Sequence, residues 1–167
     1  GGFGVVLGGA LAQSLGVRVG DAVTLIAPSG QVTPAGVVTT LAGTVGTSGT
    51  ADGTGAAARF TFPQGLAVDS AGNVYVAEPF TQTIRKITPA GVVTTLAGKA
   101  DVVGHKDGAG TAALFDTPRG ITYDPALKAL FVTDTGNRVI RRVTLAGAVT
   151  TYAGSPGVEG ADEGLFA

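Results

Sequence analysis

The stretch TPAGVVTTLAG, residues 33–43, decides how the rest of this chain is organised. It recurs unchanged at 88–98, and an edited copy, TLAGAVTTYAG, occupies 144–154. Copies that return at a nearly constant spacing indicate one supersecondary unit used repeatedly. The sequence therefore predicts a repeat protein in which each copy forms the same small group of elements.

Each full unit contains four short apolar runs separated by turn-forming residues. The runs are 65–68, 74–77, 83–87 and 92–97 in the first unit, and 120–123, 129–133, 139–143 and 148–153 in the second. The connections DSAGN at 69–73 and PAG at 89–91 are rich in the residues that tight turns favour. The first two runs of each unit are almost continuously apolar, which is typical of strands covered on both faces. Four-stranded sheets stacked around an axis have such strands, so we expect β-propeller blades.

The words of the repeat add a family resemblance to this pattern. FPQGLAVDSAGNVYVAE at 62–78 and IRKITPAGVVTTLAG at 84–98 have counterparts in the second unit. In these words the chain resembles NHL repeats over 33–154 and, in part, to residue 167. NHL proteins form propellers that mostly bind proteins, RNA or carbohydrate-like ligands, and a few of their relatives are enzymes.

The resemblance implies an all-β, incomplete propeller with two full four-stranded blades. Its expected divisions are a non-repeat segment at 1–32, the outer strand of a preceding blade at 33–43, blades at 44–98 and 99–154, and the truncated start of a further blade at 155–167. The copies of the repeated word at 37–42, 92–97 and 148–153 should all be outer-edge strands with matching geometry.

The residues before the first repeat have a different character. Leu7, Leu11 and Leu15 share one helical face, so we expect a short helix followed by a strand. The words LGGALAQSLGVRVGD at 7–21 and VTLIAPSGQVTPAG at 23–36 make residues 4–36 resemble the extracytoplasmic domain of lipoprotein-releasing ABC-transporter permeases. This resemblance implies a fusion at the shared TPAG and an extracytoplasmic (secreted or periplasmic) location.

Composition narrows the classes of function. Eleven basic and twelve acidic residues give a net charge of −1, and the basic residues are scattered, so we expect no nucleic-acid partner. Cysteine is absent, which excludes disulfides and thiol chemistry. No apolar run approaches the roughly 20 residues that a spanning helix needs. Methionine is also absent, so we expect the chain to be processed, truncated or excised from a longer product.

We expect the long loops of the blades to lie on one face. In an up-and-down sheet, alternate connections lie at the same end of the strands. The between-blade segments 44–58 and 99–113 should therefore lie beside the loops 78–82 and 134–138. Because binding residues concentrate on loops that a rigid scaffold positions, this face supplies the ligand-contact candidates. They are Glu78, His105, Asp134, Asn137 and Arg138.

Charged residues that recur with the repeat have two interpretations. Asp52, Asp107 and Asp162 each return after 55 residues, and carboxylates around a rim could bind Ca²⁺, which needs six to eight oxygen ligands. Alternatively, the Asp-Gly pairs start a tight turn in every blade, and we favour this interpretation because repeated positions usually report the fold. Beyond weak Ca²⁺ candidates we expect no metal or other cofactor. For Arg85 and Arg141 we expect structural pairing with Glu78 and Asp134.

His105 is the one histidine, and its counterpart in the first unit is Thr50. A residue that departs from the repeat is a better functional candidate than a repeated one. A lone histidine without cysteines does not make a typical zinc site, and no serine is placed for a catalytic triad. We therefore interpret His105 as a solvated loop residue and assign no catalytic residue.

These observations favour a non-catalytic binding or scaffold module for a protein or carbohydrate-like ligand. Two alternatives remain open: a propeller-class enzyme, lactonase-like or lyase-like, that uses rim carboxylates and His105, or a fragment of a lipoprotein-releasing permease. Two blades leave apolar faces uncovered, which we expect to be lined by Val68, Val76, Ile121 and Phe131. We therefore expect self-association that completes a ring, with three copies as the simplest solution.

Overall fold

The computed structural model describes residues 39–159. The chain divides into two compact units, Gly1–Thr39 and Thr40–Ala167, and every element described below lies in the second unit. The helix and strand expected in 1–32, most of the strand expected at 33–43, and the end of the tail lie outside the described residues.

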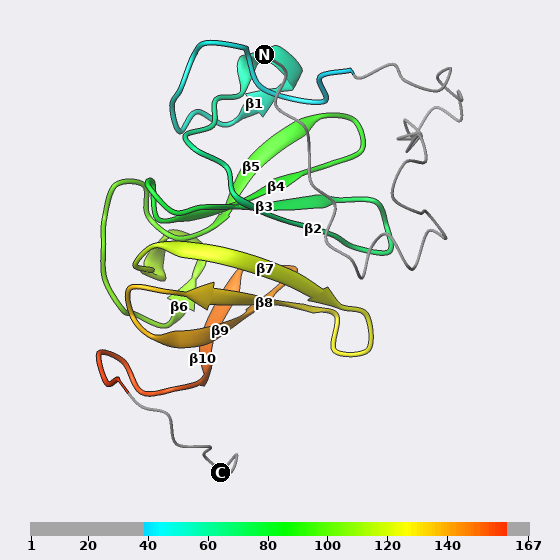
Figure 1. Cartoon of the computed structure of the whole chain (residues 1–167). Helices are drawn as coiled ribbons and strands as arrows, with labels where there is room; N and C mark the ends of the chain where they lie inside the picture. The colour runs from blue at the N-terminus through cyan, green and yellow to red at the C-terminus, as the bar shows by residue number, and fades with distance from the viewer. Residues whose placement is uncertain (1–38, 160–167) are drawn as a thin grey trace, which may run out of the picture. The chain divides into compact units, whose positions relative to one another are not determined.

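Two antiparallel five-stranded sheets make up the described part of the chain (Figure 1). Sheet 1 has the strand order β1-β5-β4-β3-β2, with β1 Gly53–Thr54, β2 Gly65–Val68, β3 Val74–Glu78, β4 Thr83–Ile87 and β5 Val92–Ala97. Sheet 2 has the order β6-β10-β9-β8-β7, with β6 Gly108–Ala109, β7 Pro118–Asp124, β8 Ala129–Asp134, β9 Val139–Thr144 and β10 Ala148–Ala153. Within residues 39–159 the helical elements are the 3₁₀ turns η1 Gly55–Ala57 and η2 Gly110–Ala112. The all-β prediction is confirmed.

Each sheet has one strand more than the predicted four. The short strands β1 and β6 come from the between-blade segments and pair with β5 and β10, which places β1 and β6 at the edges of the sheets. The words at 92–97 and 148–153 are therefore strands, as predicted, but they are not the outermost ones. Their geometry matches: each carries one extra residue, Leu96 or Tyr152, where its register against the preceding strand shifts.

The strand expected at 37–42 is absent from its described part, 39–42. A β-strand needs a hydrogen-bonded neighbour, and residues 1–32 do not carry the repeat words that would supply one. The segment nevertheless occupies the place of an outer strand beside sheet 1. Gly43 donates its amide hydrogen to the carbonyl of Gly55 at 3.0 Å, and Gly98, its repeat counterpart, does the same to Gly110 at 3.1 Å.

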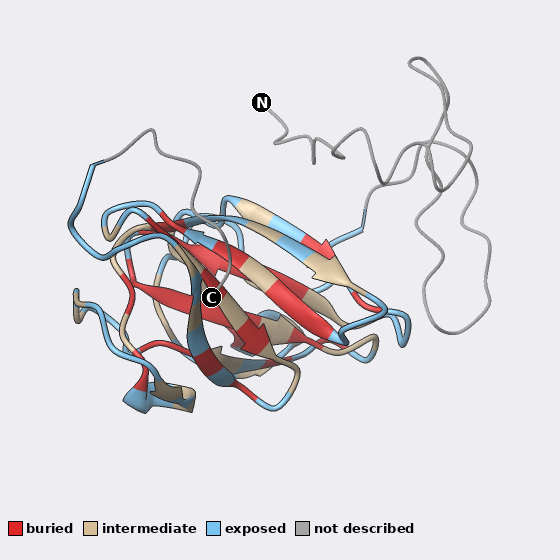
Figure 2. Cartoon of the chain, turned by 90° about the horizontal axis from the view of Figure 1, so that it is seen from below, coloured by how far each residue is buried: buried red, intermediate tan, exposed pale blue. Residues whose placement is uncertain are grey.

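The main core lies between the two sheets, where β7 packs across β2 and β3. Figure 2 shows that buried residues concentrate in the strands, whereas exposed residues concentrate in the loops. The core is formed by apolar side chains from both sheets: Ala67, Tyr75, Ala77, Ile84, Ala97, Ala113, Phe115, Leu130, Val132, Val143 and Val149. A smaller cluster of Ala58, Val76, Ile87 and Val93 lies on the other face of sheet 1, under Ala42 and Phe60.

The expectation that the first strand of each unit is covered on both faces is wrong for β2. Only Ala67 of β2 is buried, whereas Leu66 and Val68 are 42% and 37% exposed. The reason is that Ala67 faces sheet 2, while its neighbours on the strand point to the opposite side, which no sheet covers within residues 39–159. Of the residues expected on uncovered faces, Val68 is one, but Val76 is buried and Ile121 packs against the main core.

The turn between β2 and β3 is built on the carboxylate of Asp69. Its Oδ1 accepts the amide hydrogens of Ala71 and Asn73, and its Oδ2 accepts hydrogen bonds from the Asn73 side chain and the buried Tyr75 hydroxyl. Burial alone would raise the pKa of Asp69, but these hydrogen bonds outweigh it and hold the pKa below its ordinary value. The DSAGN segment therefore forms the predicted turn.

Close packing between the end of β5 and the start of β4 requires glycine at position 98. Gly98 has φ +89°, and a Cβ there would lie 2.2 Å from the carbonyl oxygen of Gln82. Gly46 has a similar φ of +79°, but no atom lies within 4 Å of the corresponding point. Alanine substitutions at these two glycines therefore distinguish the free-energy cost of the backbone conformation from the free-energy cost of a steric clash.

We expect Gly98→Ala to lower the free energy of unfolding by about 2 to 5 kcal/mol, because it adds overpacking to backbone strain. Gly46→Ala, which adds strain alone, should cost about 1 to 2 kcal/mol. Urea unfolding followed by circular dichroism measures both values. Equal losses would show that Gly98 does not lie as close to the Gln82 carbonyl as described.

Candidate binding face

The between-blade segments lie on the same face as the loops that follow β3 and β8, as predicted. Asp101 donates its amide hydrogen to Thr81 at 3.0 Å, and the Asn137 side chain donates to the carbonyl of Gly104 at 2.9 Å. The amide of Gly157 reaches the carbonyl of Asn137 at 3.1 Å. We call this surface, formed by 44–64, 78–82, 99–117 and 134–138, the loop face; it includes the residues that lead from each between-blade segment into β2 and β7.

A buried arginine fastens the loop face to sheet 1. The side chain of Arg85 is fully buried and forms ion pairs with Glu78 at 2.9 Å and with Asp52 at 2.8 Å. The same guanidinium donates to the carbonyl oxygens of Arg59 and Ala51, both at 3.0 Å. Four hydrogen bonds from one planar group thus join β4 to the end of β3 and to two points of the between-blade segment.

Arg141 repeats this arrangement in sheet 2. It pairs with Asp134 and Asp107, both at 2.7 Å, and donates to the carbonyls of Leu114 and Lys106, both at 3.0 Å. The guanidinium carbons lie 5.2 Å and 5.1 Å from the ring centroids of Phe60 and Phe115, respectively. The predicted pairing of Arg85 with Glu78 and of Arg141 with Asp134 is therefore present in the structure.

The recurring aspartates belong to the same networks and do not begin the tight turns that the Asp-Gly pairs suggested. Asp52 accepts hydrogen bonds from the amide and hydroxyl of Thr95, and Asp107 does the same with Thr151. The glycines that follow begin β1 and β6, so the turn interpretation is wrong, although the role is structural. Burial would raise the pKa of Asp107, but the hydrogen bonds from Thr151 and Arg141 lower it overall.

The carboxylates of Asp52 and Asp107 are engaged by arginine side chains, which does not favour the Ca²⁺ interpretation. Asp52 and Asp107 are each bonded to a guanidinium, which competes with a cation for the same oxygens. Asp162 lies outside the described residues. Within 39–159 no group of three or more His, Cys, Asp or Glu side chains is placed to hold a metal ion.

The five predicted ligand-contact residues do not form one accessible site, although Asn137 and Asp134 are in contact. The side chains of Glu78 and Asp134 are completely buried in the arginine networks, and burial raises the pKa of Glu78 against the opposing hydrogen bonds of Thr61 and Arg85. Asn137 is half-buried and donates to Asp134 and Gly104. These three side chains therefore hold the loop face in place.

The other two predicted residues are exposed but point to different partners. The Nε2 atom of His105 lies 3.0 Å from the hydroxyl of Thr151, a residue of β10. Arg138 pairs with Glu159 at 2.7 Å and donates to the carbonyl of Gly157, both in the segment after sheet 2. Both side chains are accessible on the loop face, without a shared site.

Two aromatic residues that were not among the predicted ligand contacts form an exposed apolar pair on the loop face. Phe62 and Phe80 are 67% and 63% exposed, and their ring centroids are 4.9 Å apart at an interplanar angle of 45°. Their counterparts in sheet 2 are Thr117 and Gly136. The sequence signals both phenylalanines by their departure from the repeat, the same criterion that singles out His105.

The backbone that displays Phe62 is held in an unusual conformation. Phe62 has φ +49°, and its counterpart Thr117 has φ +56°, a region that β-branched residues rarely adopt. In sheet 2 the amide of Thr117 donates to the Gln82 side chain at 2.7 Å, which ties this loop to sheet 1. Because the conformation recurs in both units, this part of the loop belongs to the scaffold, and only its side chain differs.

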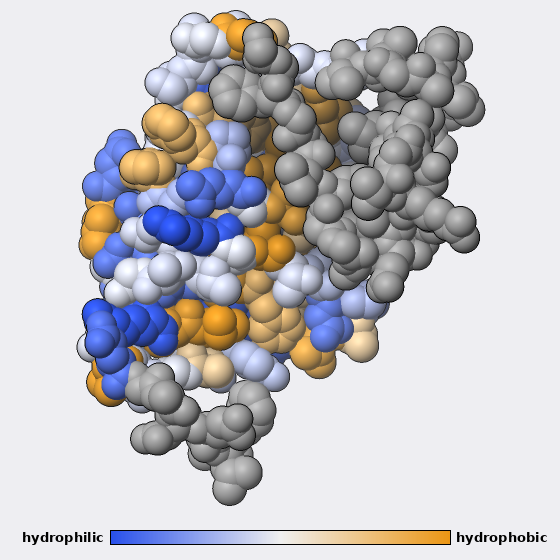
Figure 3. Space-filling model, in the orientation of Figure 1, coloured by the Kyte–Doolittle hydropathy of each residue, from blue (hydrophilic) through white to orange (hydrophobic). Residues whose placement is uncertain are grey.

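The surface is mixed in hydropathy. On the side drawn in Figure 3, strongly hydrophilic residues are separated by neutral and hydrophobic ones. No helix among residues 39–159 is long and apolar enough to cross a membrane.

Comparison with known proteins supports the fold more strongly than any activity. A family model described as "Beta-propeller repeat" (SBBP) matches residues 54–77. A structural genomics protein of unknown function from Bacteroides thetaiotaomicron is 31% identical, with a TM-score of 0.57, over 65% of this chain and 26% of that one. With the stacked antiparallel sheets, these matches show a β-propeller module.

Two further structures are described as auxiliary nutrient binding proteins. The one from Bacteroides thetaiotaomicron is 25% identical over 74% of this chain and 30% of its own, with a TM-score of 0.56. The one from Bacteroides ovatus is 27% identical over 68% of this chain and 28% of its own, with the same TM-score. The chain thus spans less than a third of the length of each of these proteins.

A short match concerns a different class of protein. The lipoprotein-releasing system transmembrane protein LolC of Neisseria meningitidis serogroup B is 58% identical over 36 residues, which are 22% of this chain and 9% of that protein. The match is too short to extend to the activity of the whole relative.

We expect Arg141→Leu to lower the free energy of unfolding by about 3 to 5 kcal/mol, because it leaves the buried carboxylate of Asp134 without its partner. The control is Arg138→Leu, whose ion pair is exposed and should cost less than about 1 kcal/mol. Urea unfolding of the two variants makes the comparison. A small loss for Arg141→Leu would contradict a fastening role for the buried network.

Proposed function

We propose that this chain is a non-catalytic, NHL-type binding module that takes its ligand on the loop face. The observation that carries the proposal is the exposed pair Phe62–Phe80 on a loop whose backbone is fixed by the repeat. Large exposed aromatic rings are costly to leave in water and are enriched where proteins bind other molecules. The type of repeat rests on the sequence words at 62–78 and 84–98.

The geometry favours a ligand that offers an apolar ring face. Two tilted phenyl rings present edges and faces to a sugar ring or to an aromatic side chain, but they offer neither charge nor hydrogen-bonding groups. A carbohydrate-like molecule or a protein segment with an aromatic residue meets this requirement. The nutrient-binding description of two structural neighbours gives independent support to a binding role.

The arginine networks explain why we propose binding and not catalysis. The carboxylates that an enzyme of this class would use, Glu78 and Asp134, are buried and occupied by Arg85 and Arg141. His105 is hydrogen-bonded to the Thr151 hydroxyl, and the Asp107 carboxylate that bonds the same hydroxyl is already paired with Arg141. The resemblance of residues 4–36 to a permease domain and the short LolC match support an extracytoplasmic location.

The proposal predicts that Phe62→Ser and Phe80→Ser each weaken ligand binding at least ~10-fold, equivalent to a loss of about 1.4 kcal/mol. The wild-type chain is applied to a glycan array and to a peptide array rich in aromatic residues, and the strongest hit is then titrated by calorimetry. Leu127→Ser is the control, because Leu127 is also exposed but lies in the β7–β8 turn at the opposite end of the strands.

Binding that survives both phenylalanine substitutions, or that Leu127→Ser weakens equally, would contradict the proposed site. A glycan hit identifies a carbohydrate-like ligand, whereas a peptide hit identifies a protein partner. Absence of binding to both arrays would contradict the proposed ligand classes.

A further inference from the structure

The contact between sheet 1 and sheet 2 is directional, because each sheet contributes a different face. Sheet 1 contributes Ala67, Tyr75 and Ile84, and all three are buried under sheet 2. The repeat places Thr122, Phe131 and Ile140 at the same positions of sheet 2, on its far side. Thr122 is exposed, and the other two are partly exposed, since nothing within 39–159 covers this side.

The far side of sheet 2 also carries a depression that is filled in sheet 1. It is lined by residues that include Thr133, Ile140, Ala153 and Gly154. In sheet 1 the matching residues Ala77, Ile84 and Ala97 pack against Phe115, a side chain that the following blade supplies. A Cβ on Gly98 would lie 3.1 Å from that ring. The depression thus has the same kind of lining as the site that holds Phe115 in sheet 1, and we call it the socket.

The apolar character of the far side agrees with this role. Phe131 and Tyr152 form an edge-to-face pair there with ring centroids 4.7 Å apart. The matching residues of sheet 1 are Tyr75 and Leu96, which contribute to the contact with sheet 2. A blade of the same repeat therefore matches this side, since sheets 1 and 2 of the chain already form one such contact.

The opposite end of the stack offers the complementary surface. Leu66 and Val68 of sheet 1 occupy the positions of Ile121 and Tyr123, which pack against sheet 1 in the internal contact. Phe60 is the counterpart of Phe115, and it packs against Ala42 and Gly43. The segment that leads into β2 therefore carries, beside sheet 1, a phenylalanine equivalent to the one that fills the depression of sheet 1.

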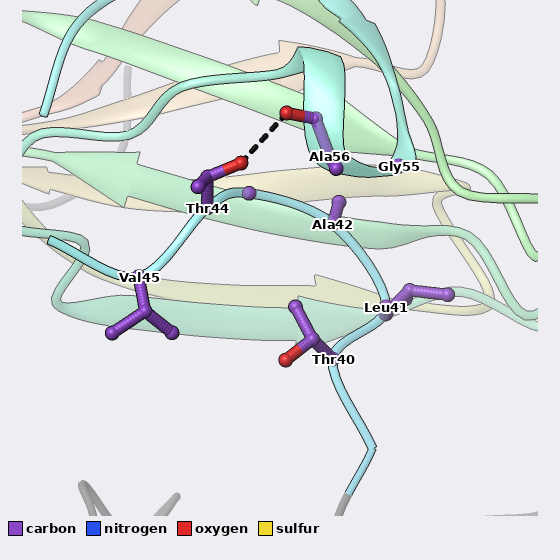
Figure 4. A pocket seen from close by; sticks show the side chains of 8 residues that line it. Thr40, Leu41, Ala42, Thr44, Val45, Gly55 and Ala56 are labelled. Atoms are coloured by element: carbon purple, nitrogen blue, oxygen red, sulfur yellow. Dashed lines mark hydrogen bonds between the residues drawn. The ribbon is translucent and has the colours of Figure 1, made fainter. Parts of the chain in front are cut away.

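Residues 40–45 occupy part of the place that a preceding blade would take. A Cβ on Gly43 would lie 3.2 Å from Phe60, which matches the relation of Gly98 to Phe115. Figure 4 shows this segment beside Gly55 and Ala56, where the Thr44 hydroxyl donates to the Ala56 carbonyl at 2.7 Å. The segment lines an open depression and has no β-partner among residues 39–159.

We propose that the far side of sheet 2 docks sheet 1 of a second copy of this chain, head to tail, with Phe60 of that copy entering the socket at Ile140 and Ala153. Residues Ala153 and Gly154 of the first copy then replace Ala42 and Gly43 of the second on the Phe60 ring. Residues 40–43 of the second copy therefore compete with the first copy for the surface around Phe60. Because the contact is heterologous, it extends beyond a dimer or closes into a ring.

The test uses two variants of the full chain that each block one side. Thr122→Arg places a charge on the exposed far side of sheet 2, and Leu66→Arg places one on the open side of sheet 1. Ala126→Arg, at an exposed turn position remote from both sides, is the control for added charge. Analytical ultracentrifugation follows the mass from low micromolar to submillimolar concentration, and circular dichroism confirms that each variant is folded.

We expect wild type and Ala126→Arg to rise above twice the 16.3 kDa mass of the chain, while each blocking variant remains a monomer. An equimolar mixture of Thr122→Arg and Leu66→Arg retains one intact contact and should form a dimer and nothing larger. Three results would overturn the proposal: a wild-type monomer at every concentration, a dimer of either blocking variant alone, or association that Thr122→Arg does not reduce. None of these outcomes depends on the ligand site at Phe62 and Phe80.

Discussion

The buried guanidinium of each repeat is the interaction on which the rest of this structure depends. Arg85 and Arg141 each bind two carboxylates and two backbone carbonyls, and each does so with the same pattern of partners. A lysine could not replace them, because a single ammonium group cannot reach four acceptors arranged around a plane. A buried ion pair does not by itself guarantee stability, but loss of one partner leaves a charge without compensation.

This arrangement links the fold to the proposed function. Without the arginines, the between-blade segments would be long loops rich in glycine with few apolar contacts of their own. The networks convert them into a fixed surface, and the paired aromatic rings of Phe62 and Phe80 are displayed on it. Repeated residues thus build the scaffold, whereas the residues that break the repeat vary its surface.

The sequence predicted the strands well because their signals are local. The boundaries of β2, β4, β5 and β10 match the apolar runs, and the positions of the turns follow from Asp, Asn, Gly and Pro. The strands β1 and β6 could not be predicted, since a two-residue strand depends on a partner far along the chain. The strand expected at 37–42 is absent from its described part for a related reason: a high β-propensity does not supply a neighbouring strand to pair with.

The candidate site was predicted less well than the fold. The pairing of Arg85 with Glu78 follows from adjacent strands, but the contact with Asp52 joins residues 33 positions apart through a loop of irregular structure. Burial of Glu78 and Asp134 depends on that loop, so the sequence alone presented them as accessible carboxylates. Comparison of the two units position by position would have identified Phe62 and Phe80, because Thr117 and Gly136 replace them in the second unit.

Native-state hydrogen exchange measures most directly whether the arginine networks join loops and sheets into one cooperative unit. The informative amides are those of Arg59 and Thr95, which are bonded to Ala51 and Asp52, compared with amides in the centre of β4. If the networks act as described, all of them exchange with the same free energy of opening, and that value equals the free energy of global unfolding. Fast exchange at Arg59 and Thr95 beside slow exchange in β4 would show that the loop face opens independently and would contradict this account.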